Sequence, residues 1–321
     1  MSQKKIQQKS KTRPLEPESL YLLQFASDPQ ISSDGTLVAF VVTNIQDESL
    51  KAEKPKKVYR SSIGLSRNGE QAVQFTSGLY RDTSPRFSPD GTSMVFLSNR
   101  ANPEKLETMQ LYFVEMGGGE AEQLTTLKSG VSNPQFSPDG NKIAFISRGD
   151  YEDKRAEDGI ARAFEHVPYK ADGMPSPGFS HDEPAQLWIY DLETNELKAV
   201  TSIQTNIEGY DWASNSSLVF AAPKNIAQRA QWSGELFQVK LEGKKPSTVQ
   251  LTNWDASLGS PKVSPDGKLV ALLASQTFHK QPGDSHLYVC KLEKGAKPER
   301  IDQKLEAYAG NAVGEIGSAH V

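Results

Sequence analysis

Short apolar stretches recur along the chain, and each is bounded by polar, turn-forming residues. The first kind of stretch is almost continuously apolar, as expected of β-strands covered on both faces. It occurs five times, at 37–42, 94–98, 142–147, 218–222 and 269–274. The second kind begins with leucine and occurs four times, at 111–115 (LYFVE), 187–191 (LWIYD), 236–240 (LFQVK) and 287–291 (LYVCK). Stretches this short are typical of strands rather than helices.

A four-residue turn precedes each stretch of the first kind. Ser-Pro-Asp-Gly occurs at 88–91, 137–140 and 264–267, with a weaker copy at 32–35 and a degenerate one at 213–216. Proline presets φ, aspartate tolerates the next turn position and glycine supplies a positive φ. Such a turn joins two antiparallel strands as a hairpin. The third positions of the five copies are 56, 49, 76 and 51 residues apart.

The first four repeats also close with a short, threonine-ended segment. These segments are Gln-Phe-Thr, Gln-Leu-Thr, Ala-Val-Thr and Gln-Leu-Thr, at 74–76, 123–125, 199–201 and 250–252. Each unit therefore holds about four strands in roughly 50 residues, which is the period of a propeller blade. A blade cannot bury both of its faces alone, so blades stack around a ring. We predict an all-β protein, a β-propeller of four-stranded blades; the alternative, a β-sandwich array, does not explain the four-strand period.

Five blades are expected, at about 27–77, 78–127, 128–202, 203–253 and 254–303. A sixth is expected to begin near Leu305, with 312–316 as its approach. The propeller then spans 27–321 as an incomplete ring in a truncated chain. The open strand edges of such a ring favour aggregation.

Two segments interrupt the repeat. Residues 15–26 (LEPESLYLLQFA) predict a short lead-in helix with Pro17 and Glu18 in its first turn, packed on the propeller edge or on a neighbouring domain. An insertion at about 149–181 explains the 76-residue step. It lies between the second and third strands of the third blade and projects from one face. Long insertions of this kind often carry function.

Composition excludes several classes of protein. The chain is 36% hydrophobic and 24% charged, and no apolar run approaches the ~18 residues of a membrane-spanning helix. No secretory signal pattern is present, so a cytoplasmic protein is expected. The net charge is −4, yet residues 1–14 hold five bases and no acid. We expect a disordered basic tail there and, elsewhere, no nucleic-acid surface.

The chemistry-bearing residues are sparse. The single cysteine, Cys290, excludes an internal disulfide framework and a multi-cysteine zinc site, and it is expected to be a buried small residue. The five histidines show no His-x-x-x-His pairing. Neither a metal nor a cofactor is therefore expected.

Four segments are specific enough to indicate a family: Pro-Glu-Ser-Leu at 17–20, SDPQIS at 27–32, YKADG at 169–173 and QLWIYD at 186–191. Across about 15–321, the chain resembles the N-terminal propeller part of acylaminoacyl peptidases and related dipeptidyl peptidases, in the prolyl oligopeptidase family of serine peptidases. The Ser-Pro-Asp-Gly turns alone are weaker support, because Tol-system periplasmic propellers share them.

The resemblance implies a partner domain. In this family the propeller is paired with a C-terminal α/β-hydrolase domain, whose Ser-Asp-His triad places its serine on a Gly-x-Ser-x-Gly elbow. This sequence has no such elbow. The nearest string, Gly-Phe-Ser-His-Asp at 178–182, lacks the closing glycine, and a triad is assembled from separate segments. We expect no catalytic residue in this chain and no activity from it alone.

The resemblance also implies that the propeller admits only short or unfolded peptides to the active site. In some relatives, acidic residues on a propeller insertion hold the free amine of a peptide, and carboxylates do give charge-assisted hydrogen bonds to an ammonium group. Glu152, Glu157 and Glu165 are the candidates here. The alternative is a solvated acidic loop, or a helix face with Glu–Arg pairs. Acylaminoacyl peptidases act on blocked N-termini, so acylaminoacyl and dipeptidyl specificities both stay open.

Three functions remain open from the sequence. The chain is a substrate-gating propeller whose partners are short peptides and a hydrolase domain, or a stand-alone Tol-like propeller that binds a protein or peptide, or an inactive truncated product. No nucleic-acid or membrane partner is expected, and a homo-oligomer stays open.

Overall fold

The structure is a computed structural model, and it describes residues 16–47, 57–102, 108–151, 183–225, 233–243, 245–254, 256–278, 281–282 and 284–304. Within these ranges, no helix is long and apolar enough to cross a membrane. The basic tail, most of the insertion and the expected start of a sixth blade lie outside the described residues.

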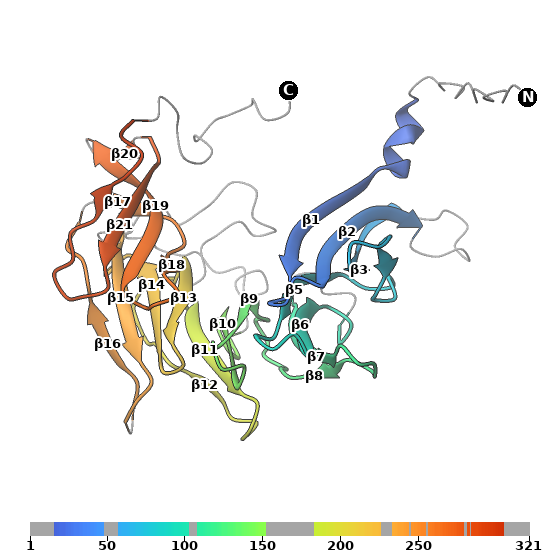
Figure 1. Ribbon diagram of the computed structural model, residues 1–321, viewed down its shortest axis with the longest axis horizontal. Helices are drawn as coiled ribbons and strands as arrows, with labels where there is room; N and C mark the ends of the chain where they lie inside the picture. The colour runs from blue at the N-terminus through green and yellow to red at the C-terminus, as the bar shows by residue number, and fades with distance from the viewer. Residues whose placement is uncertain are drawn as a thin grey trace, which may run out of the picture.

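Five antiparallel sheets follow one another around an arc, which confirms the predicted β-propeller of four-stranded blades (Figure 1). We number the blades from one to five in chain order. In the first four blades the strands lie in sequence order across the sheet, and in the fifth the first strand is split into β17 and β18, which both pair with β19.

The strand bounds follow the sequence repeat closely. They are β1 Gln24–Ile31, β2 Leu37–Asp47, β3 Lys57–Arg67, β4 Val73–Gln74, β5 Asp82–Phe87, β6 Ser93–Ser98, β7 Gln110–Glu115, β8 Glu122–Gln123, β9 Ser132–Phe136, β10 Lys142–Ser147, β11 Gln186–Asp191, β12 Leu197–Ala199, β13 Gly209–Ser214, β14 Ser217–Ala222, β15 Glu235–Lys240, β16 Ser247–Gln250, β17 Ala256–Leu258, β18 Lys262–Val263, β19 Leu269–Phe278, β20 Gln281–Pro282, β21 His286–Lys291 and β22 Glu299–Arg300.

The core is divided among the interfaces between neighbouring blades. Every residue of β6 and of β14 is buried, because successive side chains of a strand point to the two neighbouring blades. Stacked aromatic pairs join the second and third strands within blades: Phe96 with Tyr112, and Phe220 with Phe237. Cys290 is buried against the fourth blade, as the sequence predicted.

The Ser-Pro-Asp-Gly turns form the same network in each complete copy. In the second blade, the Gly91 N–H donates to the Ser88 carbonyl (2.9 Å), and Gly91 has φ +73°. The Ser88 hydroxyl donates to Asp90 (2.6 Å) and accepts from the Ser93 N–H (3.0 Å). The serine is therefore the residue that ties the turn to the start of the second strand.

The closing threonines also have one repeated role. Each threonine hydroxyl accepts a hydrogen bond from a backbone N–H of the third strand, at 2.9–3.0 Å in four blades. In the fifth blade, Asp302 takes this place and accepts from the Leu287 N–H at 3.3 Å. Because an unpaired buried N–H is costly, this hydroxyl fixes the short outer strand to the sheet.

The lead-in helix is shorter than the sequence predicted. Residues Pro17–Leu22 form a single 3₁₀ helix, η1, and Gln24 already belongs to β1. None of its residues is buried, and Leu20 and Leu22 are exposed. Figure 1 shows η1 at the start of β1, where the Tyr21 ring lies 5.1 Å from Lys57 Nζ at the start of β3.

Candidate functional site

The three predicted glutamates lie outside the described residues. Glu152, Glu157 and Glu165 belong to the insertion, as does the Gly-Phe-Ser-His-Asp string. The insertion does connect β10 to β11, the second and third strands of the third blade, as expected. Its two ends are tied together, because Arg148 Nε donates to the Glu183 carbonyl at 3.0 Å.

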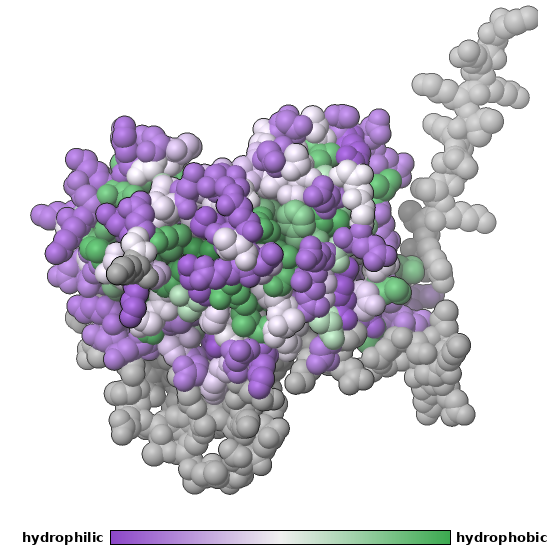
Figure 2. All heavy atoms as spheres, turned by 90° about the horizontal axis from the view of Figure 1, so that it is seen from below, coloured by the Kyte–Doolittle hydropathy of each residue, from purple (hydrophilic) through white to green (hydrophobic). Residues whose placement is uncertain are grey.

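The described residues contain a different candidate site, at the centre of the arc. The ends of all five inner strands and residues of all five repeated turns line one cavity of about 510 Å³. We call it the central opening. It lies on the side of the turns between first and second strands, the turn face, whereas the insertion leaves from the opposite ends of the strands. Figure 2, which views the molecule from below, shows hydrophobic residues gathered across the middle of this face between hydrophilic ones.

A local backbone irregularity directs the inner strands towards the opening. Asp28, Ser84 and Asn133 occupy equivalent positions in the first three blades, and each has a positive φ, between 49° and 53°. Each is followed by proline, and the strand pairing shifts register there. Such bulges bend a strand and re-aim its next side chains. The residue after each proline is Gln30, Arg86 or Gln135.

These polar residues, with their counterpart in the fourth blade, form a ring around the opening. The ring consists of Gln30, Arg86, Gln135 and Asp211, and all four line the cavity. Beside each lies an apolar residue that packs on the preceding blade, except in the first blade, where Ile31 is exposed. The opening therefore offers hydrogen-bonding groups set against apolar walls.

The charges of the ring are paired between blades. Arg86 Nη1 donates to both carboxylate oxygens of Asp28, at 2.9 and 3.0 Å, and so links the first two blades. Asp211 accepts from the Val263 N–H at 2.9 Å and lies 3.7 Å from Lys262 Nζ, which links the fourth and fifth. The ring is therefore nearly neutral and held in place, with one cationic and one anionic side.

Tyr210 connects the third and fourth blades directly below the ring. Its side chain is fully buried, and its hydroxyl lies 2.6 Å from the Asn133 carbonyl and 2.7 Å from the Ala144 carbonyl, to which it donates. Burial raises the pKa of this phenol well above its usual value. Tyr210 therefore stays neutral and acts as a fixed donor.

The turns around the opening carry ionised carboxylates, although these aspartates are not part of the cavity lining. The serine hydroxyl within each turn, and then the backbone N–H two residues after the aspartate, lower the pKa of Asp34, Asp90 and Asp266 below the usual range. These aspartates therefore stay ionised near neutral pH, and each accepts a hydrogen bond from the serine hydroxyl of its own turn.

The side chains that line the opening are hydrogen-bonding groups and apolar groups. In the described part of the chain, no group of three or more His, Cys, Asp or Glu is placed to hold a metal ion. The ring offers hydrogen-bond donors and acceptors, and the apolar residues beside it offer contact surface. Sequence reasoning missed this ring, although one signal was available: Pro-Gln, Pro-Arg or Pro-Lys, an apolar residue, and then the turn motif.

Comparison with known proteins supports the fold. The family described as "TolB beta propeller domain" matches residues 24–161. An uncharacterized peptidase of Bacillus subtilis, YuxL, is 30% identical over 183 residues, which is 55% of this chain and 26% of that protein.

Solved structures give the same result over most of the chain. An acylaminoacyl peptidase in complex with Z-Gly-Gly-Phe-chloromethyl ketone is similar with a TM-score of 0.67 and 18% identity, over 92% of this chain and 42% of that one. The propeller domain of the Trilobed protease from Pyrococcus furiosus is similar with a TM-score of 0.56 and 18% identity, over 90% and 75%. The resemblance to the propeller of acylaminoacyl peptidases is thus confirmed in fold. The chain spans about a quarter of the curated peptidase and about two fifths of the acylaminoacyl peptidase.

Proposed function

We propose that this chain is the substrate-gating propeller of a serine exopeptidase of the prolyl oligopeptidase family, acylaminoacyl or dipeptidyl peptidase-like, that acts on short peptides. An α/β-hydrolase domain outside these 321 residues supplies catalysis. The observation that carries the proposal is the central opening, on which all five inner strands converge.

The size of the opening supports selection for short peptides. Its volume of about 510 Å³ lies within the roughly 300–1,000 Å³ of small-ligand sites. A folded domain of ~100 residues has a radius of gyration of about 13 Å and cannot enter. An extended peptide can, and the side-chain amides of Gln30 and Gln135 offer hydrogen bonds to its backbone.

Peptide titration of the chain tests this proposal. By calorimetry or NMR, tetra-alanine should bind, and Gln135→Ala should weaken binding by about 2- to 12-fold, because one hydrogen bond contributes roughly 0.5–1.5 kcal/mol. Gln238→Ala is the matched control, since Gln238 lies on β15 and does not line the opening. Equal affinity in both variants, or competition by a folded domain, would contradict the proposal.

The pairing with a hydrolase has separate tests. The coding sequence that follows codon 321 should encode a Gly-x-Ser-x-Gly elbow in frame. The purified chain should not hydrolyse aminoacyl chromogenic esters or amides. Serine-dependent turnover by pure material would show that catalysis resides in this chain.

The insertion glutamates distinguish dipeptidyl from acylaminoacyl specificity in this proposal. In a dipeptidyl peptidase-like enzyme, Glu152, Glu157 and Glu165 would hold the free amine of the peptide by charge-assisted hydrogen bonds. The variant with all three changed to Gln should then lose its preference for free over acetylated tetra-alanine. If the triple variant keeps the same preference between free and acetylated tetra-alanine, the three glutamates do not bind the amine. That result would favour acylaminoacyl specificity.

A second candidate is a stand-alone propeller that binds a protein or peptide partner without catalysis. The match to the TolB propeller family favours it. It predicts a monodisperse chain with one cooperative melting transition, and an in-frame stop after codon 321. In either function we place the protein in the cytoplasm, where cysteine thiols are kept reduced, as the single Cys290 requires.

A further inference from the structure

The turn between β3 and β4 contains an Asn-Gly pair, Asn68-Gly69. The Asn68 N–H donates to the Thr36 carbonyl at 2.7 Å. The Glu70 N–H donates to the Arg67 carbonyl at 2.8 Å and closes the turn. Asn68 and Gly69 have positive φ angles of 49° and 74°, which Asn-Gly adopts readily in tight turns. Both residues are exposed, so the pair is accessible to water.

Two groups in this turn have no hydrogen-bond partner among the described residues: the side-chain amide of Asn68 and the N–H of Gly69. These are the two groups that react together in deamidation, because the backbone nitrogen that follows an asparagine can close a five-membered ring on its side-chain carbon Cγ. Glycine hinders this attack least, since it has no Cβ. A Cβ built at Gly69 would meet no atom within 4 Å, so the space around the turn is open.

The corresponding nitrogen is engaged after the other described asparagines. After most of them, the following N–H donates a hydrogen bond of 2.9–3.3 Å; these N–H groups belong to Arg100, Lys142, Glu196, Ile207, Ser216 and Trp254. Asn102 and Asn133 precede proline, which has no N–H. Asn44 lies within β2, which is paired on both sides, and Asn225 is followed by a residue outside the described ranges. Among the described N–H groups that follow an asparagine, that of Gly69 is therefore the one without a partner.

The Asp-Gly pairs of the repeated turns could close the same ring, but they are held by hydrogen bonds. In the turns at 32–35, 88–91, 137–140 and 264–267, the glycine N–H donates to the carbonyl of the first serine at 2.8–2.9 Å. The hydroxyl of that serine donates to the aspartate at 2.6 Å in each turn. Both groups needed for ring closure are therefore engaged in these four turns.

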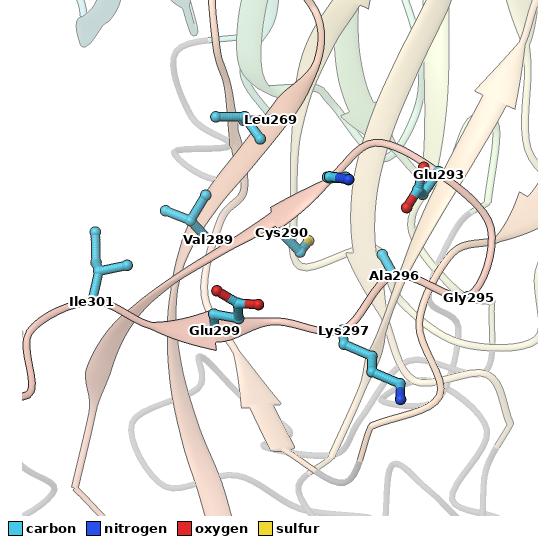
Figure 3. A pocket seen from close by; sticks show the side chains of 10 residues that line it. Leu269, Val289, Cys290, Glu293, Gly295, Ala296, Lys297, Glu299 and Ile301 are labelled. Carbon is cyan, nitrogen blue, oxygen red and sulfur yellow. The ribbon is translucent and has the colours of Figure 1, made fainter.

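The turn of the fifth blade that corresponds to the Asn68 turn lacks the reactive pair. Figure 3 shows Gly295 in that turn, between β21 and β22. The Gly295 N–H donates to the Leu251 carbonyl at 2.8 Å, and the residue before Gly295 is lysine. The Asn-Gly turn thus belongs to the first blade and is not part of the repeat.

We propose that Asn68 is a site of spontaneous deamidation, and that this modification is faster there than at any other described asparagine. The Gly69 nitrogen forms a bond to Cγ of Asn68, the bond from Cγ to Nδ2 breaks, and ammonia leaves with the proton of the Gly69 N–H. The resulting succinimide then takes up water, which opens the ring at either of its carbonyls. The product is an aspartyl or isoaspartyl residue at position 68, with a new carboxylate in both cases. Water is the co-reactant of the whole sequence.

The turn has to open before the Gly69 nitrogen can reach Cγ, and exposed loops open at low cost in free energy. The isoaspartyl product lengthens the backbone path through the turn, so we expect it to weaken the hydrogen bonds to the Thr36 and Arg67 carbonyls. Because Asn68 bonds to Thr36, directly after the first repeated turn, the new charge lies on the turn face. This inference does not depend on the proposed function.

Peptide mapping by mass spectrometry tests the site in the full chain, incubated at mildly alkaline pH. Asn68 should convert to a mixture of aspartyl and isoaspartyl forms before any other described asparagine does. On ion exchange, the aged chain should show a more acidic species that elutes with the variant Asn68→Asp, and this variant should not gain that species on ageing. An intact Asn68 in the aged chain, or earlier conversion of another described asparagine, would overturn the proposal.

The variant Asp90→Asn separates the effect of structure from that of sequence. It creates a second Asn-Gly pair, but there the Gly91 N–H donates to the Ser88 carbonyl at 2.9 Å. In the folded chain, the asparagine introduced at position 90 should deamidate about 2- to 12-fold more slowly than Asn68, which is the factor that one hydrogen bond contributes. In urea, which unfolds both turns, the two rates should become similar. Equal rates in the folded chain, or the same difference in urea, would overturn the role assigned to the unbonded N–H.

Discussion

The threonine that closes the second blade allows a sharp test of how the short outer strands are held. Thr125 is 1% exposed. Its hydroxyl accepts from the Leu111 N–H at 2.9 Å and donates to Gln110 Oε1 at 2.8 Å. Thr125→Val replaces the hydroxyl by a methyl group of similar size, so it removes both hydrogen bonds without leaving a cavity.

The expected cost follows from these contacts. The lost bond to Gln110 contributes roughly 0.5–1.5 kcal/mol, and Gln110 keeps its bonds to Leu127. The Leu111 N–H loses its acceptor in a buried place, which costs about 1–3 kcal/mol. We therefore expect Thr125→Val to lower the free energy of unfolding by about 1.5–4.5 kcal/mol.

Urea denaturation, followed by circular dichroism, measures this change. Thr125→Ser keeps the hydroxyl and should recover most of the loss. Thr92→Val is the control, because the Thr92 hydroxyl bonds to Asp90 in an exposed turn, and a change within about 0.5 kcal/mol is expected there. If Thr125→Val costs no more than this surface control, or if serine brings no recovery, the role assigned to these threonines is refuted.

Three further predictions concern single residues. Gly130→Ala should destabilise the chain far more than Gly295→Ala in thermal melts: both glycines have a positive φ, but only at Gly130 would a Cβ lie 2.8 Å from a backbone oxygen, that of Met109. Burial opposes ionisation of Asp302, but hydrogen bonds from Arg300, His286 and a backbone N–H outweigh it and lower the pKa to about 2. The pKa of Asp302 in the unfolded chain is near 3.8, so the ionised carboxylate stabilises the fold above that pH, and this stabilisation is lost as the pH falls through about 2. Asp302→Asn should therefore flatten the dependence of unfolding free energy on pH between these two values. An unchanged pH dependence would contradict this role of Asp302. Burial raises the pKa of the Cys290 thiol to about 11, so a thiol reagent at pH 8 should react only after urea is added; rapid labelling of the native chain would contradict its burial.

The strands were predictable because their signal is local. The expected second strands at 94–98 and 218–222 differ from β6 and β14 by a single residue at the start. Burial on both faces forces a nearly continuous apolar run, and the turn that precedes it is specified by serine, proline and glycine. Both signals lie within a few residues of the structure they specify.

The lead-in segment and the candidate site were not predictable in the same way. The apolar spacing of 15–26 suggested a helix that packs, but only Pro17–Leu22 is helical, as a 3₁₀ helix with no buried residue, and Gln24 already begins β1. The ring of Gln30, Arg86, Gln135 and Asp211 draws one residue from each of four blades. A local pattern, proline followed by a polar residue, an apolar residue and the turn motif, marks three of these four positions, but Asp211 lacks the proline. No pattern within one blade shows that the four residues meet at one opening.

The sequence by itself therefore determined the blade: its four strands, its turn, its closing threonine and its repeat. Only the tertiary structure decided what the blades make together. The central opening exists because five inner strands, from β1 in the first blade to β18 in the fifth, meet at one axis. The paired charges of the ring likewise depend on which blades are neighbours. Strand pattern is set by burial within one sheet, whereas the site is set by packing between sheets, and that packing has no signature in any single segment.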